Sequence, residues 1–256
     1  MTEDDAQSWL IEALDVSRET LERLDVFRRM VIAENERQNL VSAGSIGQFW
    51  VRHIADSAQL SVFGSRGGAE ARRAPSASPL PFRGGAGGGE PGKDSLYAQL
   101  PTPTPPLKGR GFNWLDLGTG AGLPGIVIAI LQDTPITMVE SRRLRVEFLE
   151  SVKAELGLSH ATILCSKLES LKPTPFAVIS ARAFAPLHRL LPLAHSFSTA
   201  ETVWLLPKGR KAREEIASVE PDWSGMFHVE QSLTDPESAI VVAQGISPRR
   251  GQRKSR

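Results

Sequence analysis

The sequence contains a single cysteine, Cys165, and no apolar run long enough to cross a membrane. One thiol excludes a disulfide framework and a cysteine-rich zinc site, and a membrane-spanning helix needs about 20 consecutive apolar residues. Residues 3–5 are acidic, where a secretory signal would begin with a basic region. From these absences we expect a cytoplasmic protein with no metal site and no membrane partner.

The chain also lacks an excess of charge of either sign. It has 30 lysines and arginines against 29 acidic residues, for a formal net charge of +1. Any surface for nucleic acid must therefore come from local patches. With 256 residues, of which 41% are hydrophobic, the chain can bury the core of one large α/β domain with a helical extension. We expect it to be a monomer.

Composition divides the chain into four parts. Residues 1–63 repeat apolar positions at helical spacing, which predicts an N-terminal helical cap whose third helix has Ser45 as its N-cap. Residues 64–111 are rich in Gly, Pro, Ala, Ser and Arg, which predicts a disordered insertion, either a solvated linker or an RNA contact. Residues 112–245 alternate strand and helix patterns, and 246–256 form a basic tail that is either an RNA-seeking arm or a solubilising end.

The alternating part predicts an α/β protein with a Rossmann-like, mostly parallel sheet that is doubly wound by helices. After the first two strands, described below, the remaining ones are expected at Ala161–Cys165, Phe176–Ser180, Thr202–Leu206, Met226–Gln231 and Ser238–Ala243. The last two read as an antiparallel pair. Cys165 falls in an apolar run and is predicted to be an inert core thiol.

A glycine-rich corner at residues 114–125 is the most informative motif. A short apolar strand runs into glycines that permit a sharp turn and close approach of a ligand, and a helix follows. Pro124 suits the first position of that helix. The next strand, 136–139, ends on Glu140, a good acceptor for ribose hydroxyls. The order of these elements predicts a nucleotide-binding unit.

Two cofactors compete for this unit. The spacing Gly120-x-Gly122-x-x-Gly125 fits a dinucleotide fingerprint. Counted from Asp116, the same segment is Asp-x-Gly-x-Gly-x-Gly, which resembles the first motif of class I methyltransferases that bind S-adenosylmethionine. The second interpretation is favoured, because Asp116 would interrupt the apolar strand that leads into a dinucleotide turn. The closing antiparallel pair also follows the class I pattern.

Other segments extend this resemblance over nearly the whole chain except the insertion and the tail. The sequence resembles the glucose-inhibited division protein B family of small-subunit ribosomal RNA guanine-N7 methyltransferases. The resemblance implies a seven-stranded class I fold with a helical cap, and methyl transfer from S-adenosylmethionine to N7 of a guanine in small-subunit (16S) ribosomal RNA or the ribosomal subunit. The matching segments are Asn39-Leu40-Val41-Ser42, Arg52-His53-Ile54-Ala55-Asp56-Ser57, the glycine corner from Gly118 to Gly125, Ile179-Ser180-Ala181-Arg182-Ala183-Phe184, and Lys208-Gly209.

The resemblance also implies site residues. It places Gly118 and Leu123 against the cofactor, Leu168 and Glu169 beside its adenine, and Arg182 near its other end. Gly120 of the glycine corner and Glu140 at the end of the next strand are also expected to bind the cofactor. By periodicity alone, Leu168 fits an ordinary core position equally well.

The implied reaction needs no general base, because guanine N7 carries a lone pair and no proton. Precise positioning then carries the catalysis and can supply ~7–11 kcal/mol. We expect Arg182, Phe184 and Lys208 to position the substrate, with Phe184 stacked on the flipped base and Arg182 holding a cofactor carboxylate or an RNA phosphate. Expected contacts to the RNA backbone come from Arg52, His53, Lys208 and Arg210.

Neighbouring chemistries fit less well. Methylation at cytosine C5 needs a cysteine nucleophile, and the fourth strand does not end in the Asn/Asp-Pro-Pro-aromatic turn of exocyclic amine methylation. Two departures from the family are Ala121, where proline is common, and Leu144, where lysine is common. Two alternatives stay open, a dinucleotide-dependent (NAD) oxidoreductase and a non-catalytic protein that binds ribosomal RNA or assists assembly.

Overall fold

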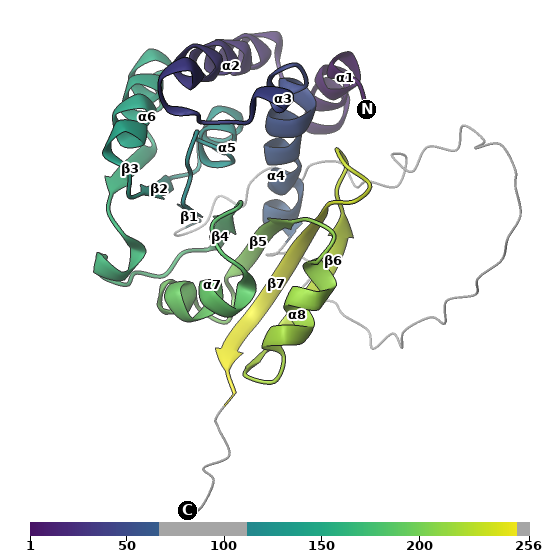
Figure 1. The fold of residues 1–256 in the computed structure, drawn as a ribbon, viewed down its shortest axis with the longest axis vertical. Coiled ribbons are helices and arrows are strands. Elements are labelled where there is room, and N and C mark those ends of the chain that lie inside the picture. Colours follow the sequence, from purple (N-terminus) through teal and green to yellow (C-terminus); the bar gives the residue numbers. More distant parts are fainter. Residues whose placement is uncertain (67–111, 250–256) are drawn as a thin grey trace, which may run out of the picture.

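The computed structural model describes residues 1–66 and 112–249 (Figure 1). Within them, seven strands form one sheet in the order β3-β2-β1-β4-β5-β7-β6. The first five strands of this order are parallel, and β7 pairs antiparallel with both β5 and β6. The strands are β1 (Trp114–Leu117), β2 (Ile136–Glu140), β3 (Ala161–Cys165), β4 (Val178–Ala181), β5 (Val203–Lys208), β6 (Trp223–Gln231) and β7 (Ala239–Pro248). The predicted fold class, a class I methyltransferase sheet, is confirmed.

Strand order reverses at β1, because the chain runs outward through β2 to β3 and then crosses back to β4. In such sheets ligands bind outside the carboxyl ends of the strands at this switch point. The residues that leave β1 and β4 at these ends are Gly118 and Arg182. The topology therefore brings the glycine corner and the Arg182 loop to the same edge.

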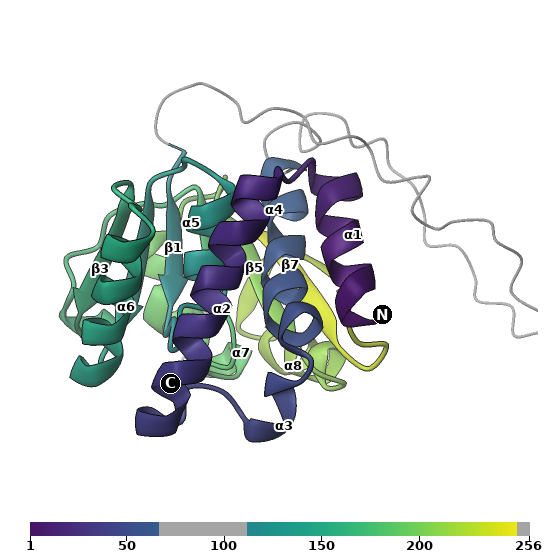
Figure 2. The same cartoon turned by 90° about the horizontal axis from the view of Figure 1, so that it is seen from above.

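Helices cover both faces of the sheet (Figure 1). Alternation along the strands sends one set of side chains to each face; in β1, Trp114 packs toward the cap and Leu115 toward the opposite face. One face carries α5 (Gly125–Leu131) and α6 (Arg143–Glu155), over which the cap helices lie (Figure 2). The other carries α7 (Leu187–Ala194) and α8 (Ala212–Val219). The cap helices are α1 (Glu3–Leu14), α2 (Arg18–Gln38), α3 (Ala43–Ile46) and α4 (Asp56–Arg66).

Three predictions need correction. Cys165 is exposed, because β3 is an edge strand and Cys165 is its last residue. The strand β7 runs to Pro248, so the first residues assigned to the basic tail belong to the sheet. Arg249 follows, and its Nε donates to the carbonyl oxygens of Glu220 and Trp223 at 2.7 and 3.1 Å. Residues 64–66, predicted to begin the insertion at 64–111, belong to α4, and residues 67–111 and 250–256 lie outside the described residues.

The cap contains a π-helical segment, η1 (Trp50–Ala55), that leads directly into α4. The predicted third helix with Ser45 as N-cap is therefore wrong: α3 is a single turn capped at Ser42, and Ser45 lies inside it. The backbone N–H groups in the first turn of η1 find their acceptor in a residue far away in the sequence. The Glu3 carboxylate accepts the N–H groups of Trp50 and Val51 at 3.2 and 3.0 Å. Such wide turns are frequent at functional sites.

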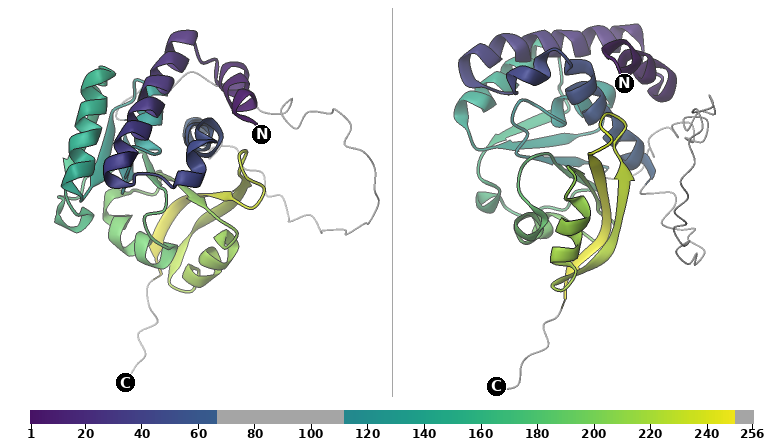
Figure 3. Two further views of the ribbon diagram at one scale, coloured as in Figure 1. Left: turned by 45° about the horizontal axis from the view of Figure 1, so that its top comes forward. Right: turned by 45° about the vertical axis from the view of Figure 1, so that its right-hand side comes forward.

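The β6–β7 hairpin reaches the cap at its tip, beside α4 (Figure 3). Gln59 of α4 joins the two parts, because its Oε1 accepts the N–H of Leu233 at 2.9 Å and its Nε2 donates to Ser232 at 3.3 Å. Both Gln59 and Ser232 are buried. Cap, sheet and hairpin are thus joined by buried hydrogen bonds.

Replacing Glu3 with alanine should destabilise the protein by about 1–2 kcal/mol, because two N–H groups of η1 would lose their acceptor. Urea unfolding measures this loss. Asp4→Ala is the matched control, since Asp4 is an exposed neighbour in the same turn of α1. Equal stability of Glu3→Ala and Asp4→Ala would contradict the stabilising role of the Glu3 hydrogen bonds to η1.

Candidate functional site

The glycine corner is built around the buried carboxylate of Asp116. Its Oδ2 accepts the N–H of Gly125, the first residue of α5, at 3.0 Å. Its Oδ1 accepts from the hydroxyl of Ser180 in β4 at 2.6 Å, and Trp114 Nε1 donates to the same hydroxyl at 2.8 Å. Burial raises the pKa of Asp116 to about 6, against the opposing effect of the Ser180 and Gly125 hydrogen bonds. One side chain thus joins β1, β4 and α5.

Three glycines of the corner, Gly118, Gly120 and Gly122, have positive φ angles of 65°, 57° and 91°. These angles are costly for other residues and keep the backbone open to a ligand. Gly118 has a second constraint, because a Cβ there would lie 2.4 Å from Cδ2 of Phe184. The Phe184 ring therefore rests on Gly118. Pro124 is the N-cap of α5, one position before the predicted one.

Glu140 ends β2 beside the corner, as predicted. It is 5% exposed, and its two oxygens accept the N–H groups of Gly120 and Arg142 at 3.1 and 2.9 Å. Nη1 of Arg145 lies 3.6 Å from Oε2. The carboxylate is held in place at the edge where a ribose would lie in this class of sheet.

The remaining predicted cofactor residues differ in exposure. Leu123 and Leu168 are buried, and Leu168 packs with Val139 in the core on the α7–α8 face. Glu169 is exposed. Leu168 and Glu169 begin the short 3-10 helix that follows β3. They lie next to one another in the chain, with one side chain in the core and the other on the surface.

His53 is not available to RNA, which corrects the role predicted for it. It is 5% exposed, and its ring contacts Phe49 edge to face at 4.8 Å. Nδ1 lies 3.1 Å from Nη2 of Arg182, and Nε2 lies 2.8 Å from the Ser45 hydroxyl. A guanidinium only donates, so Nδ1 accepts and the ring is neutral with its proton on Nε2. Burial, then Arg182 and Arg52, lower the pKa of His53 to about 3.

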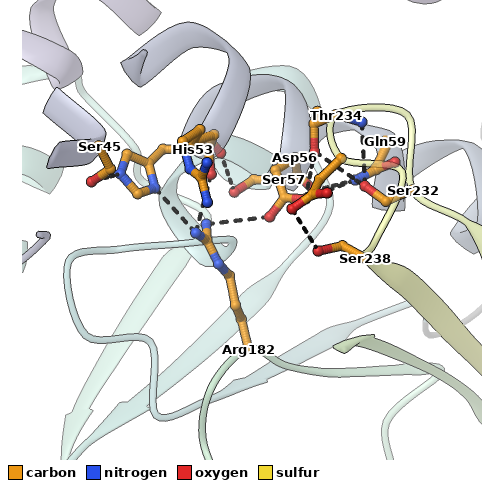
Figure 4. Close-up of polar contacts among 11 residues, drawn as sticks. Ser45, His53, Asp56, Ser57, Gln59, Arg182, Ser232, Thr234 and Ser238 are labelled. Atoms are coloured by element: carbon orange, nitrogen blue, oxygen red, sulfur yellow. Dashed lines mark hydrogen bonds and ion pairs between the residues drawn. The ribbon is translucent and has the colours of Figure 1, made fainter. Parts of the chain in front are cut away.

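Arg182 connects the sheet to the cap (Figure 4). Its Nη2 also donates to the carbonyl oxygen of Arg52 at 3.1 Å, and its Nη1 lies 3.5 Å from Oδ2 of Asp56. Nη1 is buried, with no hydrogen-bond partner among the described residues. Ala183, the next residue, has a φ of 52°, and the chain bends there between Arg182 and Phe184.

A cavity of about 520 Å³ opens beside Arg182 and Phe184. Its wall includes Arg52 and Asp56 from the cap, the loop after β4, the end of β5, and the tip of the β6–β7 hairpin with Thr234. This volume is in the usual range for a small-molecule site, about 300–1,000 Å³. Arg52 is exposed at this wall, where it can meet a phosphate.

Two other predicted RNA contacts are engaged within the protein. Lys208 Nζ donates to Oε2 of Glu215 at 2.9 Å and to the carbonyl oxygen of Ala185 at 3.0 Å. Only 10% of the Lys208 side chain is exposed, so it fixes the loop after β4 rather than presenting a free charge. Arg210 is exposed and pairs with Glu237.

Sequence reasoning missed the side chains that organise this wall. Asp56 belongs to the matching segment Arg52–Ser57 but was assigned no role, and Glu215 and Thr234 belong to no motif. Thr234 Oγ1 donates to Oδ1 of Asp56 at 3.1 Å, across 178 positions of the chain. No local pattern encodes such a contact. No cluster of potential metal ligands and no membrane-spanning helix is found in residues 1–66 and 112–249.

The sheet order, the Asp116 corner and the acid ending β2 define a class I S-adenosylmethionine-dependent methyltransferase. The positive-φ glycines, the fixed Glu140 carboxylate and Nη1 of Arg182, which has no hydrogen bond among the described residues, suit a ligand with a ribose and a carboxylate. Comparison with known proteins narrows the class. The family model described as rRNA small subunit methyltransferase G (GidB) matches residues 103–238, and the chain belongs to this family.

Curated relatives extend the match over most of the chain. A "Ribosomal RNA small subunit methyltransferase G" of Novosphingobium aromaticivorans is 43% identical over 245 residues, which cover 95% of this chain and 89% of the relative. Another of the same name, from Zymomonas mobilis, is 42% identical over 98% of this chain and 97% of its own length. Among solved structures, the ribosomal protein L11 methylase from Lactobacillus delbrueckii is 17% identical, with a TM-score of 0.43, and covers 56% of this chain and 72% of its own.

Acid should destabilise the protein partly through His53. Its folded pKa of about 3 lies below the unfolded value of about 6.5, so the unfolded state binds more protons between these values. The contribution of the neutral His53 ring to the free energy of unfolding is complete above pH 6.5 and is lost as the pH falls toward 3. Between pH 7 and 4 the loss from this residue is about 3 kcal/mol.

Urea unfolding of the wild type and His53→Gln at both pH values tests this. The variant should lose about 3 kcal/mol less than the wild type on acidification. His228→Gln, which alters a histidine exposed on β6, is the control and should behave as the wild type. An unchanged pH dependence in His53→Gln would refute the prediction.

Gly118→Ala should weaken S-adenosylmethionine binding about tenfold or more, because the new methyl group would displace Phe184 from the corner. Calorimetric titration measures the affinity. Gly157→Ala is a close control, because Gly157 also has a positive φ, 61°, but has nothing within 4 Å of its Cβ position. Both variants should lose stability to backbone strain. Only Gly118→Ala should lose affinity, and wild-type binding by that variant would contradict the assignment.

Proposed function

We propose that the protein transfers a methyl group from S-adenosylmethionine to N7 of a guanine in small-subunit ribosomal RNA. The observation that carries the proposal is the continuity between two features, the Asp116 corner and the cavity beside it, with Phe184 touching both. Family membership supplies the substrate class, since the curated relatives are named for the ribosomal RNA small subunit.

Methyl transfer to guanine N7 requires little proton transfer by the protein. When bound, S-adenosylmethionine supplies an electrophilic methyl group on sulfur. The N7 lone pair forms the new bond to this carbon while the carbon–sulfur bond breaks, and no proton leaves the base. The chain therefore has to hold N7 in line with the methyl group, and such positioning accounts for about 7–11 kcal/mol in favourable cases. No histidine or carboxylate is required as a general base.

The predicted residues other than His53 have a place in this scheme. Glu140 accepts the ribose hydroxyls, and Gly118, Gly120 and Leu123 line the cofactor, with Leu168 and Glu169 on the adenine side. Phe184 stacks on the flipped guanine. The buried Nη1 of Arg182 takes a carboxylate of the cofactor or a phosphate of the RNA, because it otherwise lacks a hydrogen-bond partner among the described residues.

Recognition of the RNA backbone falls to the rim of the cavity. Arg52 is exposed there, and Arg210 is exposed after β5. Lys208 acts through Glu215 and Ala185, which it ties to the loop that carries Phe184. We place the RNA between the cap, residues 1–63, and the sheet domain, residues 112–245. The protein acts as a cytoplasmic monomer on the subunit or its RNA.

The proposal predicts label transfer from methyl-labelled S-adenosylmethionine to small subunits prepared from a strain that lacks this protein. Digestion and mass spectrometry should identify 7-methylguanosine. Gly120→Val should abolish transfer, because Gly120 has a positive φ of 57° and lies at the corner. Gly157→Ala should retain transfer.

The alternative outcomes separate the rival functions. Cofactor binding without label on RNA or subunits would leave a binding or assembly protein. Binding of NAD in preference to S-adenosylmethionine would favour an oxidoreductase. Label at another atom of the RNA would retain the methyltransferase and refute the guanine-N7 assignment.

A further inference from the structure

The two carboxylate oxygens of Asp56 are used unequally. Oδ1 accepts from Gln59 Nε2 at 3.0 Å and from Thr234 Oγ1 at 3.1 Å. Oδ2 faces Nη1 of Arg182 at 3.5 Å and has no hydrogen bond within the described residues. The side chain is 15% exposed and forms part of the cavity wall. A firmly held carboxylate thus has one oxygen that pairs with Arg182 and can still accept a hydrogen bond from a ligand.

Other acids of the same wall are already engaged. Asp235 accepts the N–H of Glu237 at 2.8 Å through Oδ1 and the Ser238 hydroxyl at 3.1 Å through Oδ2. Glu215 Oε2 accepts from Lys208 and from the N–H of Leu187, both at 2.9 Å. Asp56 therefore combines an open acceptor with a fixed position, and the hydrogen bonds to Oδ1 define its orientation.

Guanine carries a hydrogen-bond donor that an acceptor such as Oδ2 of Asp56 can recognise. Its N7 lies on one edge of the base, whereas N1–H and the amino group lie on the opposite side. Adenine has a bare lone pair at N1 and a C–H at C2. When N7 points at the reacting methyl group, an oxygen on the far side meets a donor in guanine and a lone pair in adenine. A site built around such a hydrogen bond rejects the analogue that lacks it.

We propose that Oδ2 of Asp56 accepts the N1–H of the target guanine and selects guanine at this site. The inference rests on the proposed function, since it takes N7 as the reacting atom. Alkylation of N7 makes the ring cationic and N1–H a stronger donor, so the contact to Asp56 strengthens as the methyl group transfers. Asp56 also offsets the charge of Arg182, which alone would oppose a cationic ring. Asp56 thus acts as a specificity and positioning residue.

Equilibrium binding of free nucleotides to the full chain with S-adenosylhomocysteine tests the contact. The wild type should bind GMP about tenfold or more tightly than AMP and than 1-methyl-GMP, whose N1 carries no hydrogen. Asp56→Asn should reduce both ratios toward one. Asp235→Asn is the control in the same wall and should keep the wild-type ratios. A purely structural role of Asp56 would weaken all three nucleotides equally and leave the ratios unchanged.

The outcomes remain decisive if Asp56→Asn does not fold, because 1-methyl-GMP tests the N1–H contact in the wild type. Equal binding of GMP and 1-methyl-GMP, or no binding of GMP at millimolar concentration, would overturn the inference. The same wild-type preparation is assayed for 7-methylguanosine formation in subunits. If the protein binds GMP and 1-methyl-GMP equally but still forms 7-methylguanosine, only the Asp56 contact is refuted. If no 7-methylguanosine forms, the proposed function is refuted.

Discussion

The site depends on one buried ion, the carboxylate of Asp116. It joins the start of α5 to β1 through Gly125 and joins β1 to β4 through Ser180. Its raised pKa of about 6 means that ionisation at neutral pH costs about 3 kcal/mol even with these hydrogen bonds. The unfolded pKa of Asp116 is 3.8, below the folded one. The free-energy cost of ionising Asp116 in the folded protein is therefore complete above pH 6 and disappears as the pH falls below 4. What the carboxylate provides is therefore position, because it fixes the glycine turn against two strands.

A second buried group connects this corner to the cap. Arg182 leaves β4 one residue beyond Ala181, and its Nη2 meets the carbonyl of Arg52 and the neutral ring of His53. The π-helical turn brings both acceptors together, and Glu3 of α1 holds the start of that turn. Hydrogen bonds thus run from Glu3 through the π-helical turn to Arg182 at the end of β4. The cap and the loop after β4 are therefore joined directly through Arg182.

The sequence was most informative where local pattern and chemistry coincide. The glycine corner, Glu140 at the end of β2, and the antiparallel closing pair all follow from spacing and residue type. Exposure was harder to predict. Cys165 looked buried because its neighbours are apolar, yet β3 lies at the edge of the sheet. His53 was predicted to contact RNA, yet it lies in the π-helical turn with its side chain buried. Long-range partners such as Thr234 for Asp56 left no trace in the local sequence.

Charge pairing around the cavity fits the chemistry of a base that becomes cationic. A free cation beside the guanine ring would oppose the transition state. The structure pairs Lys208 with Glu215 and sets Asp56 against Arg182, so neither cation acts alone. Arg52 remains exposed at the rim, where an RNA phosphate rather than the base would meet it. In the proposed complex, positive charge would thus meet the RNA backbone, and the inner wall would offer the Asp56 carboxylate to the guanine ring.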